Sequence, residues 1–177
     1  MQYTLRNVLR KYKMDELVSP LFYCLPVGLR FVSDEKSAKK RVSAVAAELF
    51  AGEMLAVLET EPEAAFEALA KGAEHISEPR ERYDPEDGSL TPYTRHYYKF
   101  EKPPFEKLAD VALRHAEHYR GRMFWVEPES GIILAVYDSR GFDVAAPRKE
   151  PLVRLYKRRK EWLSEIDFPQ MRLNFED

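Results

Sequence analysis

The sequence predicts a single α+β domain spanning residues 1–177, with a mostly antiparallel sheet of about five or six strands and packed helices. Helical and extended patterns are interspersed along most of the chain. Three strand-like segments then follow one another closely at 122–126, 132–137 and 142–145. The short connections between these three segments end in glycine, which favours antiparallel hairpins.

The N-terminal part of the chain begins with cations and continues into clear periodic patterns. Four cations and no acid lie within the first thirteen residues, so 1–20 is expected to form a basic helical arm. A short strand is expected at 26–31. Apolar residues recur at helical spacing across 37–51, which predicts an amphipathic helix. The nearly uninterrupted apolar run at 54–58 indicates a strand covered on both faces, and Thr60 is a candidate cap for the helix that follows.

The second half begins with a polar stretch. Residues 76–92 contain three prolines and many charges, and are predicted to form an exposed polar loop. The segment 93–100 alternates like a strand, and 105–119 reads as a helix whose leucine and alanine side chains face the core. A final helix is expected from 149 to 165, with a basic outer face.

Composition excludes several classes of protein. The 28 basic and 30 acidic residues give a net charge of −2, so the chain as a whole has no drive toward nucleic acid or an anionic membrane. The single cysteine, Cys24, fits a reducing compartment. No signal peptide and no stretch of ~20 apolar residues is found. We therefore expect a cytoplasmic protein that does not contact membranes.

Complete catalytic and cofactor motifs are absent from the sequence. It has no nucleophile elbow, no Walker loop and no dinucleotide-binding glycine loop. His115 and His118 have a spacing that two ligands of one metal can share, but no third ligand follows at a recognisable spacing. We expect no metal and no cofactor. The sequence leans against an enzyme but leaves enzymatic activity open, and no residue is assigned a catalytic role.

A motif near the C-terminus carries a family resemblance. The segment 137–144 reads Tyr-Asp-Ser-Arg-Gly-Phe-Asp-Val and resembles the Y-D-D-R-G-x-D motif of a family of uncharacterised bacterial proteins. In that family a helix with Leu-Tyr and then Trp follows the motif, and Leu155-Tyr156 and Trp162 stand here. The second acid of the motif is Ser139 in this chain, which weakens the idea that paired carboxylates hold a metal there.

The strand expected at 26–31 is similar to another landmark of the same family, a glycine-x-Arg-Phe strand followed by a helix with a basic residue, here Arg41. The acid often found after Arg-Phe is Val32 here. The resemblance spans roughly residues 26 to 167. It implies the same α+β fold and assigns no activity.

The turn at 138–141 has a structural and a functional interpretation. In the first, Asp138 accepts backbone N–H bonds, Gly141 is left-handed and Arg140 pairs with Asp143. In the second, these polar groups form a recognition surface. The candidate binding residues are Arg30, Tyr137, Asp138, Arg140, Asp143 and Arg159.

Arg159 is placed near the middle of the apolar stripe of the predicted last helix. A guanidinium there must meet a carboxylate or extend to water along its stem. Asp138 and Asp143 are the expected partners, because their hairpin directly precedes the helix.

A second candidate surface lies on the strand at 93–100. Tyr93, Arg95, Tyr97 and Lys99 share one face, and tyrosines mixed with cations can stack bases and hold phosphates. The alternative is a half-exposed strand in which tyrosine rings and basic stems pack together.

These features favour a non-catalytic binding or interaction protein, of which immunity-type and regulatory proteins are examples. The partner is expected to be another protein or a second copy, whose acidic 78–87 segment complements the basic last helix. A nucleic-acid-binding or nucleic-acid-processing protein is the first alternative. A small-molecule enzyme with its site near the Tyr137–Gly141 turn is the second.

Overall fold

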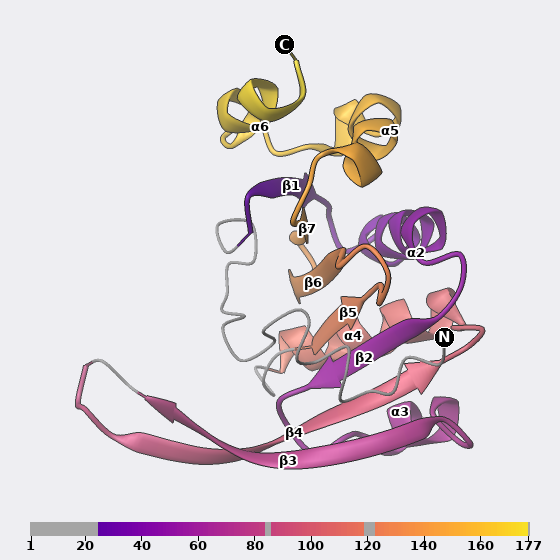
Figure 1. Cartoon of the computed structure of the whole chain (residues 1–177), viewed down its shortest axis with the longest axis vertical. Coiled ribbons are helices and arrows are strands. Elements are labelled where there is room, and N and C mark those ends of the chain that lie inside the picture. The colour runs from indigo at the N-terminus through magenta and orange to yellow at the C-terminus, as the bar shows by residue number, and fades with distance from the viewer. Residues whose placement is uncertain (1–24, 84–85, 119–122, 177) are drawn as a thin grey trace.

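Seven strands pair side by side in one antiparallel sheet, in the order β1-β7-β6-β5-β2-β4-β3. Figure 1 shows the computed structural model, which describes residues 25–83, 86–118 and 123–176. The predicted α+β class is confirmed, although the sheet has seven strands where five or six were expected. The strands are β1 (Val27–Val32), β2 (Met54–Leu58), β3 (Glu74–Tyr83), β4 (Leu90–Phe100), β5 (Met123–Val126), β6 (Ile133–Asp138) and β7 (Gly141–Ala146). The helices are α2 (Ala38–Leu49), α3 (Ala64–Leu69), α4 (Phe105–Glu117), α5 (Glu150–Arg158), a short 3-10 helix (Lys160–Trp162) and α6 (Phe168–Phe175).

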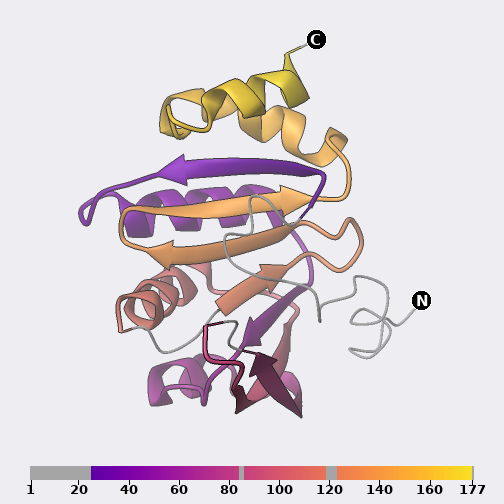
Figure 2. The ribbon, with the colours of Figure 1, turned by 90° about the vertical axis from the view of Figure 1, so that its left-hand side faces the viewer.

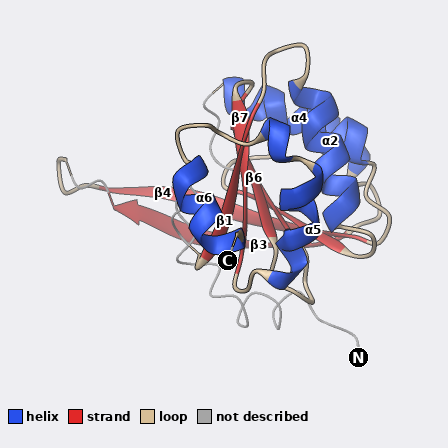
Figure 3. Cartoon of the chain, turned by 90° about the horizontal axis from the view of Figure 1, so that it is seen from above, coloured by secondary structure: helices blue, strands red, loops and turns tan. Residues whose placement is uncertain are grey.

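Helices α2 and α4 pack against each other on one face of the sheet, as Figure 3 shows. The main core lies beneath them and includes Phe31 of β1 and Phe142 of β7, whose rings stack with centroids 4.9 Å apart. A second apolar cluster, with Leu55 and Tyr97, lies on the opposite face. Helices α5 and α6 lie beyond the β1 edge of the sheet (Figure 2). No described helix is long and apolar enough to span a lipid bilayer.

The most regular sequence patterns form the expected elements. All five residues of β2 are buried, as the run of apolar residues predicted. Helix α2 buries its apolar stripe, including Val42 and Val45. Thr60 does not cap a helix, because α3 begins at Ala64 with Glu63 at its N-terminal flank. The basic arm predicted at 1–20 and Cys24 lie outside the described residues.

The prediction of a loop at 76–92 is wrong, although most of the described residues in this range are exposed, as expected. Its first part belongs to β3, which pairs residue by residue with β4 from Glu74↔Lys99 to Tyr83↔Leu90. The strand was missed because neither of its faces is continuously apolar, and its interior holds Pro79. Proline is tolerated on an edge strand, and β3 is the last strand of the sheet.

The outer half of this hairpin extends past the rest of the sheet. β2 pairs with β4 only from His96 to Phe100, so residues 90–95 pair with β3 alone. Residues 78–83 and 90–95 therefore form a two-stranded projection, here called the arm, which Figure 1 shows reaching away from the body.

The prediction of a single last helix at 149–165 is wrong. Helix α5 ends at Arg158, the 3-10 helix follows, and α6 begins at Phe168. The chain turns there because Leu163 forms a bridge with Phe31 and the Ser164 N–H donates to the Arg30 carbonyl at 2.8 Å. These tertiary contacts with β1 override the helical spacing of the apolar residues.

Gly141 is required by a close approach, not by the positive φ that the sequence suggested. Its backbone is outside the left-handed region, whereas Gly131, in the preceding turn, has φ 74°. A Cβ on Gly141 would collide with the phenol of Tyr137 and with the backbone carbonyl of Phe31. The absence of a side chain lets Tyr137 and β1 both lie against this residue.

Replacing Gly141 by alanine should therefore destabilise the fold by about 1–3 kcal/mol through overpacking. Gly52→Ala is the matched control, since a Cβ there meets nothing within 4 Å, and its stability should change by less than about 1 kcal/mol. Urea unfolding of both variants measures the difference. Equal stability of the two variants would contradict the close approach.

Candidate functional site

A charged pair joins the two strands at the β1 edge of the sheet. Arg30 of β1 lies directly opposite Asp143 of β7. Its Nε donates to Asp143 Oδ1 at 2.9 Å and its Nη2 donates to Oδ2 at 3.1 Å. This two-point geometry is the strongest way for a guanidinium to bind a carboxylate. Asp143 is only 1% exposed, so the carboxylate depends on this partner.

The segment before α6 completes the same cluster. Asp167 Oδ2 lies 3.5 Å from Arg30 Nη1 and accepts a hydrogen bond from Ser164 Oγ at 2.9 Å. The backbone N–H of Arg30 is 3.5 Å from the sulfur of Met171. The Arg30 cluster (Arg30, Tyr137, Asp143, Ser164 and Asp167) thus ties β1, β7 and the start of α6 together.

Arg30 and Tyr137 both keep their protons at neutral pH. The hydrogen bonds that Arg30 donates to Asp143 raise the pKa of Arg30 above its ordinary value. Tyr137 lies beside it, with its ring centroid 5.8 Å from the guanidinium carbon. Burial, helped by the charge of Asp143, raises the pKa of Tyr137 to about 12, so its phenol is neutral at pH 7. General acid–base catalysis works best with a group that titrates near the working pH, so these two groups are better suited to holding strands together.

The turn between β6 and β7 is built as expected in one respect and differently in another. Asp138 accepts the backbone N–H of Arg140 at 2.7 Å, as predicted. The predicted pairing of Arg140 with Asp143 is wrong, because the Arg140 side chain bonds Asp138 and Asp143 faces Arg30. The turn is fastened to β1 by Ser33, whose N–H donates to the Arg140 carbonyl at 2.7 Å.

Arg159 meets an acid, which was one of the two outcomes that the sequence left open, but the partner is Glu48 of α2. Its Nε donates to Glu48 Oε1 at 2.9 Å, and its guanidinium carbon lies 4.3 Å from the centroid of the Trp162 ring. Neither predicted partner is involved, since Asp138 and Asp143 bind other arginines. The two residues are 111 positions apart in the sequence, so no local sequence pattern predicts their contact.

The strand face proposed for nucleic acid is largely buried. Tyr97 is in the apolar cluster, and Arg95 donates from Nη2 to the buried Glu59 at 2.6 Å. Lys99 Nζ lies 2.8 Å from Glu53. The expectation of a half-exposed face is therefore wrong for its two central side chains. The reason is that Tyr97 packs into the second apolar cluster and Arg95 pairs with the buried Glu59.

Glu59 also anchors the base of the arm, a role that sequence reasoning missed. Besides Arg95, it accepts a hydrogen bond from Arg82 Nη2 at 2.7 Å. The Arg82 guanidinium lies 5.0 Å from the centroid of the Tyr93 ring. Glu59 directly follows the buried strand β2. An acid in that position is the sequence feature that could have predicted this anchoring role.

The histidines do not form a metal site in the described chain. His115 is buried and its Nε2 lies 3.2 Å from Thr60 Oγ1, whereas His118 is exposed and its ring bonds a backbone carbonyl of its own helix. Within residues 25–83, 86–118 and 123–176, no group of three or more His, Cys, Asp or Glu side chains is placed to hold a metal ion.

A comparison with protein-family models matches residues 3–167 to a domain of unknown function, DUF3885. The chain belongs to this family. No curated protein and no solved structure matches it. Helix α6 begins just beyond the part of the chain that the DUF3885 model covers.

In this DUF3885 domain, the residues on which the resemblance rested meet in pairs that hold the fold. Arg30 and Asp143 form the ion pair across β1 and β7, and Gly141 of the turn lies close to Phe31 of β1. The guanidinium carbon of Arg41 lies 5.3 Å from the centroid of the Trp162 ring. These pairs secure β1 and α2 to the C-terminal part of the chain.

Asp143→Ala should destabilise the DUF3885 domain by about 3 kcal/mol, because it removes one partner of a largely buried ion pair. Arg140→Ala is the control, since this arginine is exposed and its pair with Asp138 is worth less than about 1 kcal/mol. Chemical unfolding measures both. If the two variants lose similar stability, the Arg30 cluster does not have the structural role assigned to it.

The raised pKa of Tyr137 predicts a pH dependence of stability. The folded state keeps its phenol protonated up to about pH 12, while the unfolded chain releases this proton near pH 10. Stability from this group is therefore complete below about pH 10 and is lost as the pH rises toward 12. Urea unfolding should show a smaller alkaline loss for Tyr137→Phe, and an unchanged loss would contradict the assignment.

Proposed function

We propose that this domain is a non-catalytic protein-interaction module that contacts its partner through the arm. The observation that carries the proposal is the exposed apolar pair at the end of the arm. Tyr83 and Leu90 lie opposite each other across the two strands and are 62% and 59% exposed. Full burial of a large apolar side chain is worth about 1.5–3 kcal/mol, so a partner that covers this pair gains substantial affinity.

The two faces of the arm differ in charge and in contacts. Side chains alternate between faces along each strand, so Arg80 and Arg82 share the face that leads to Glu59. Arg80 pairs with Glu78 on that face at 2.8 Å. The other face, here called the outer face, holds no cation, and apart from the half-buried Thr94 its members are exposed. Its members are Pro79, Glu81, Tyr83, Leu90, Pro92 and Thr94.

The arm is held in position at its base. A two-stranded hairpin on its own is marginally stable in water. Here Glu59, directly after the neighbouring strand β2, binds Arg82 on the arm and Arg95 at its base. A surface that is already ordered loses less conformational entropy on binding. This supports recognition by a preformed arm.

Two parts of the arm are better suited to binding than the outer edge of β3. One is the outer face, and the other is the tip, here defined as Tyr83, Leu90 and the turn residues Glu86 and Asp87. Pro79 lacks one backbone donor, and the charges of Glu78 and Arg80 flank it. Charges and proline on an edge strand disfavour the addition of another strand. Within the interaction class, an immunity-type or regulatory role remains the more specific form of this proposal.

The proposal is tested with the tagged full chain purified from its source cells. The Tyr83→Ser/Leu90→Ser variant should lose a defined protein that accompanies the wild type. Leu173→Ser is the matched control, because Leu173 is also an exposed apolar residue, 81% accessible, on α6. Circular dichroism should show both variants folded. A partner retained by the double variant, or lost equally from the control, would contradict the role of the arm.

A further inference from the structure

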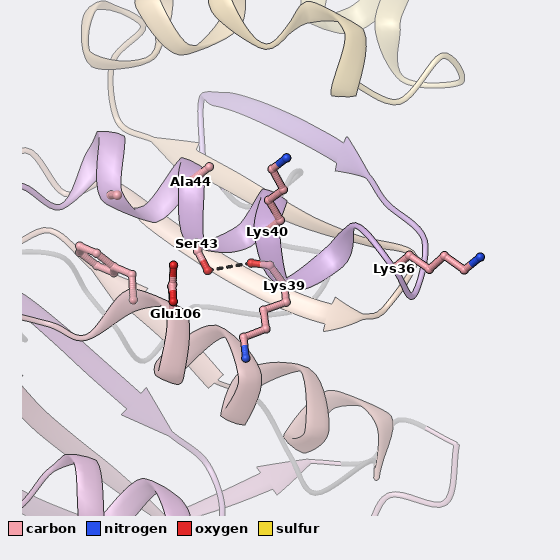
Figure 4. A pocket seen from close by; sticks show the side chains of 8 residues that line it. Lys36, Lys39, Lys40, Ser43, Ala44 and Glu106 are labelled. Atoms are coloured by element: carbon pink, nitrogen blue, oxygen red, sulfur yellow. Dashed lines mark hydrogen bonds between the residues drawn. The ribbon is translucent and has the colours of Figure 1, made fainter.

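A basic groove lies between α2 and α4, on the helical face of the sheet. It encloses about 680 Å³. Apolar surface from Ala44 and Ala47 of α2 and from Phe105 of α4 forms part of its lining. Figure 4 shows Ser43 in this groove, where its hydroxyl donates to the Lys39 carbonyl at 2.7 Å.

Three lysines line one end of the groove and make its solvent-facing rim basic. Lys36 precedes α2, and Lys39 and Lys40 lie in its first turn. Lys39 reaches toward α4, where its Nζ is 3.3 Å from Asp110 Oδ1, whereas Lys36 and Lys40 extend away from the helices (Figure 4). Glu106 is the acid among the lining residues. The groove therefore suits a ligand that is both apolar and acidic.

The outer face of the arm has the complementary composition. It presents the exposed Tyr83 and Leu90 together with one charged residue, the acid Glu81. The turn beyond adds Glu86 and Asp87, both exposed. The cations of the arm lie on the opposite face, where Arg80 and Arg82 bind Glu78 and Glu59. Complementary charge of this kind fixes the register of an interface and raises its rate of formation.

We propose that the arm of one copy docks by its outer face in the α2–α4 groove of a second copy. This inference rests on the proposed interaction role of the arm and names its partner as the same chain. Figures 1 and 3 place the arm and the two helices on opposite sides of the molecule, so the arm does not lie in the groove of its own chain. The contact joins different surfaces of the two copies, and it builds rings or open chains of molecules.

Charge reversal tests this interface in both directions. Lys36→Glu/Lys40→Glu gives an acidic groove, and Glu81→Lys/Glu86→Lys gives a basic tip. Each variant alone should associate at least about tenfold more weakly than the wild type, because like charges then face each other. An equal mixture should recover association, since each tip then meets a groove of opposite charge. Sedimentation velocity of the full chains at low salt, where screening is weakest, measures all four samples.

Arg154→Glu/Lys157→Glu is the matched control, because it makes the same change in net charge on the exposed face of α5. This variant should associate like the wild type. Three results would overturn the proposal, namely a monomeric wild type, a mixture that does not recover association, or a control that loses it. The last result would place the acidic tip on α5 instead of the groove.

Sedimentation of the wild type and of Tyr83→Ser/Leu90→Ser, together with the purification from source cells, separates this inference from the proposed function. If the wild type is monomeric but Tyr83→Ser/Leu90→Ser still loses its accompanying protein, the arm binds a different protein and self-docking is wrong. If self-association occurs and the double variant abolishes it, both statements are supported. If the double variant self-associates normally and keeps every accompanying protein, both fail.

Discussion

The Arg30–Asp143 ion pair is the interaction on which the C-terminal part of the structure depends. Asp143 is buried on an inner strand, and its charge is tolerated because Arg30 meets both carboxylate oxygens. Through the same guanidinium, Asp167 and the start of α6 are drawn to β1. The last third of the chain is therefore attached to a strand from its first fifth.

Ion pairs that join elements remote in sequence occur at two other places in the described chain. Glu59 binds Arg95 and Arg82 where the arm leaves the sheet, and Glu48 binds Arg159 where α5 ends on α2. In each case a carboxylate from one element receives guanidinium groups from another that is remote in sequence. Charged residues make up 33% of the chain, and these pairs show that part of that charge is used internally. Ion pairs thus orient the layers that the apolar core holds together.

The sequence was informative where one face of an element is continuously apolar. The run at 54–58 and the stripe across 37–51 identified β2 and α2, because burial leaves a regular pattern. Strand β3 and residues 90–92 of the arm were not predicted as strand, because these segments are exposed on one face and carry ion pairs on the other. Arg159 illustrates a partial success, since local spacing placed it where either an acid or water must meet it, but did not identify Glu48 as the partner. Such partners are set by how α2 and α5 come together, which only the whole fold decides.

The outer face of the arm has a consequence for how the family can diversify. Its side chains add little to the core, since the anchoring residues of the arm lie on the other face. Substitutions at Tyr83, Leu90 or Glu81 can therefore accumulate without loss of folding stability. Under the proposed interaction role, selection for a new binding specificity can act on this surface while the scaffold stays unchanged.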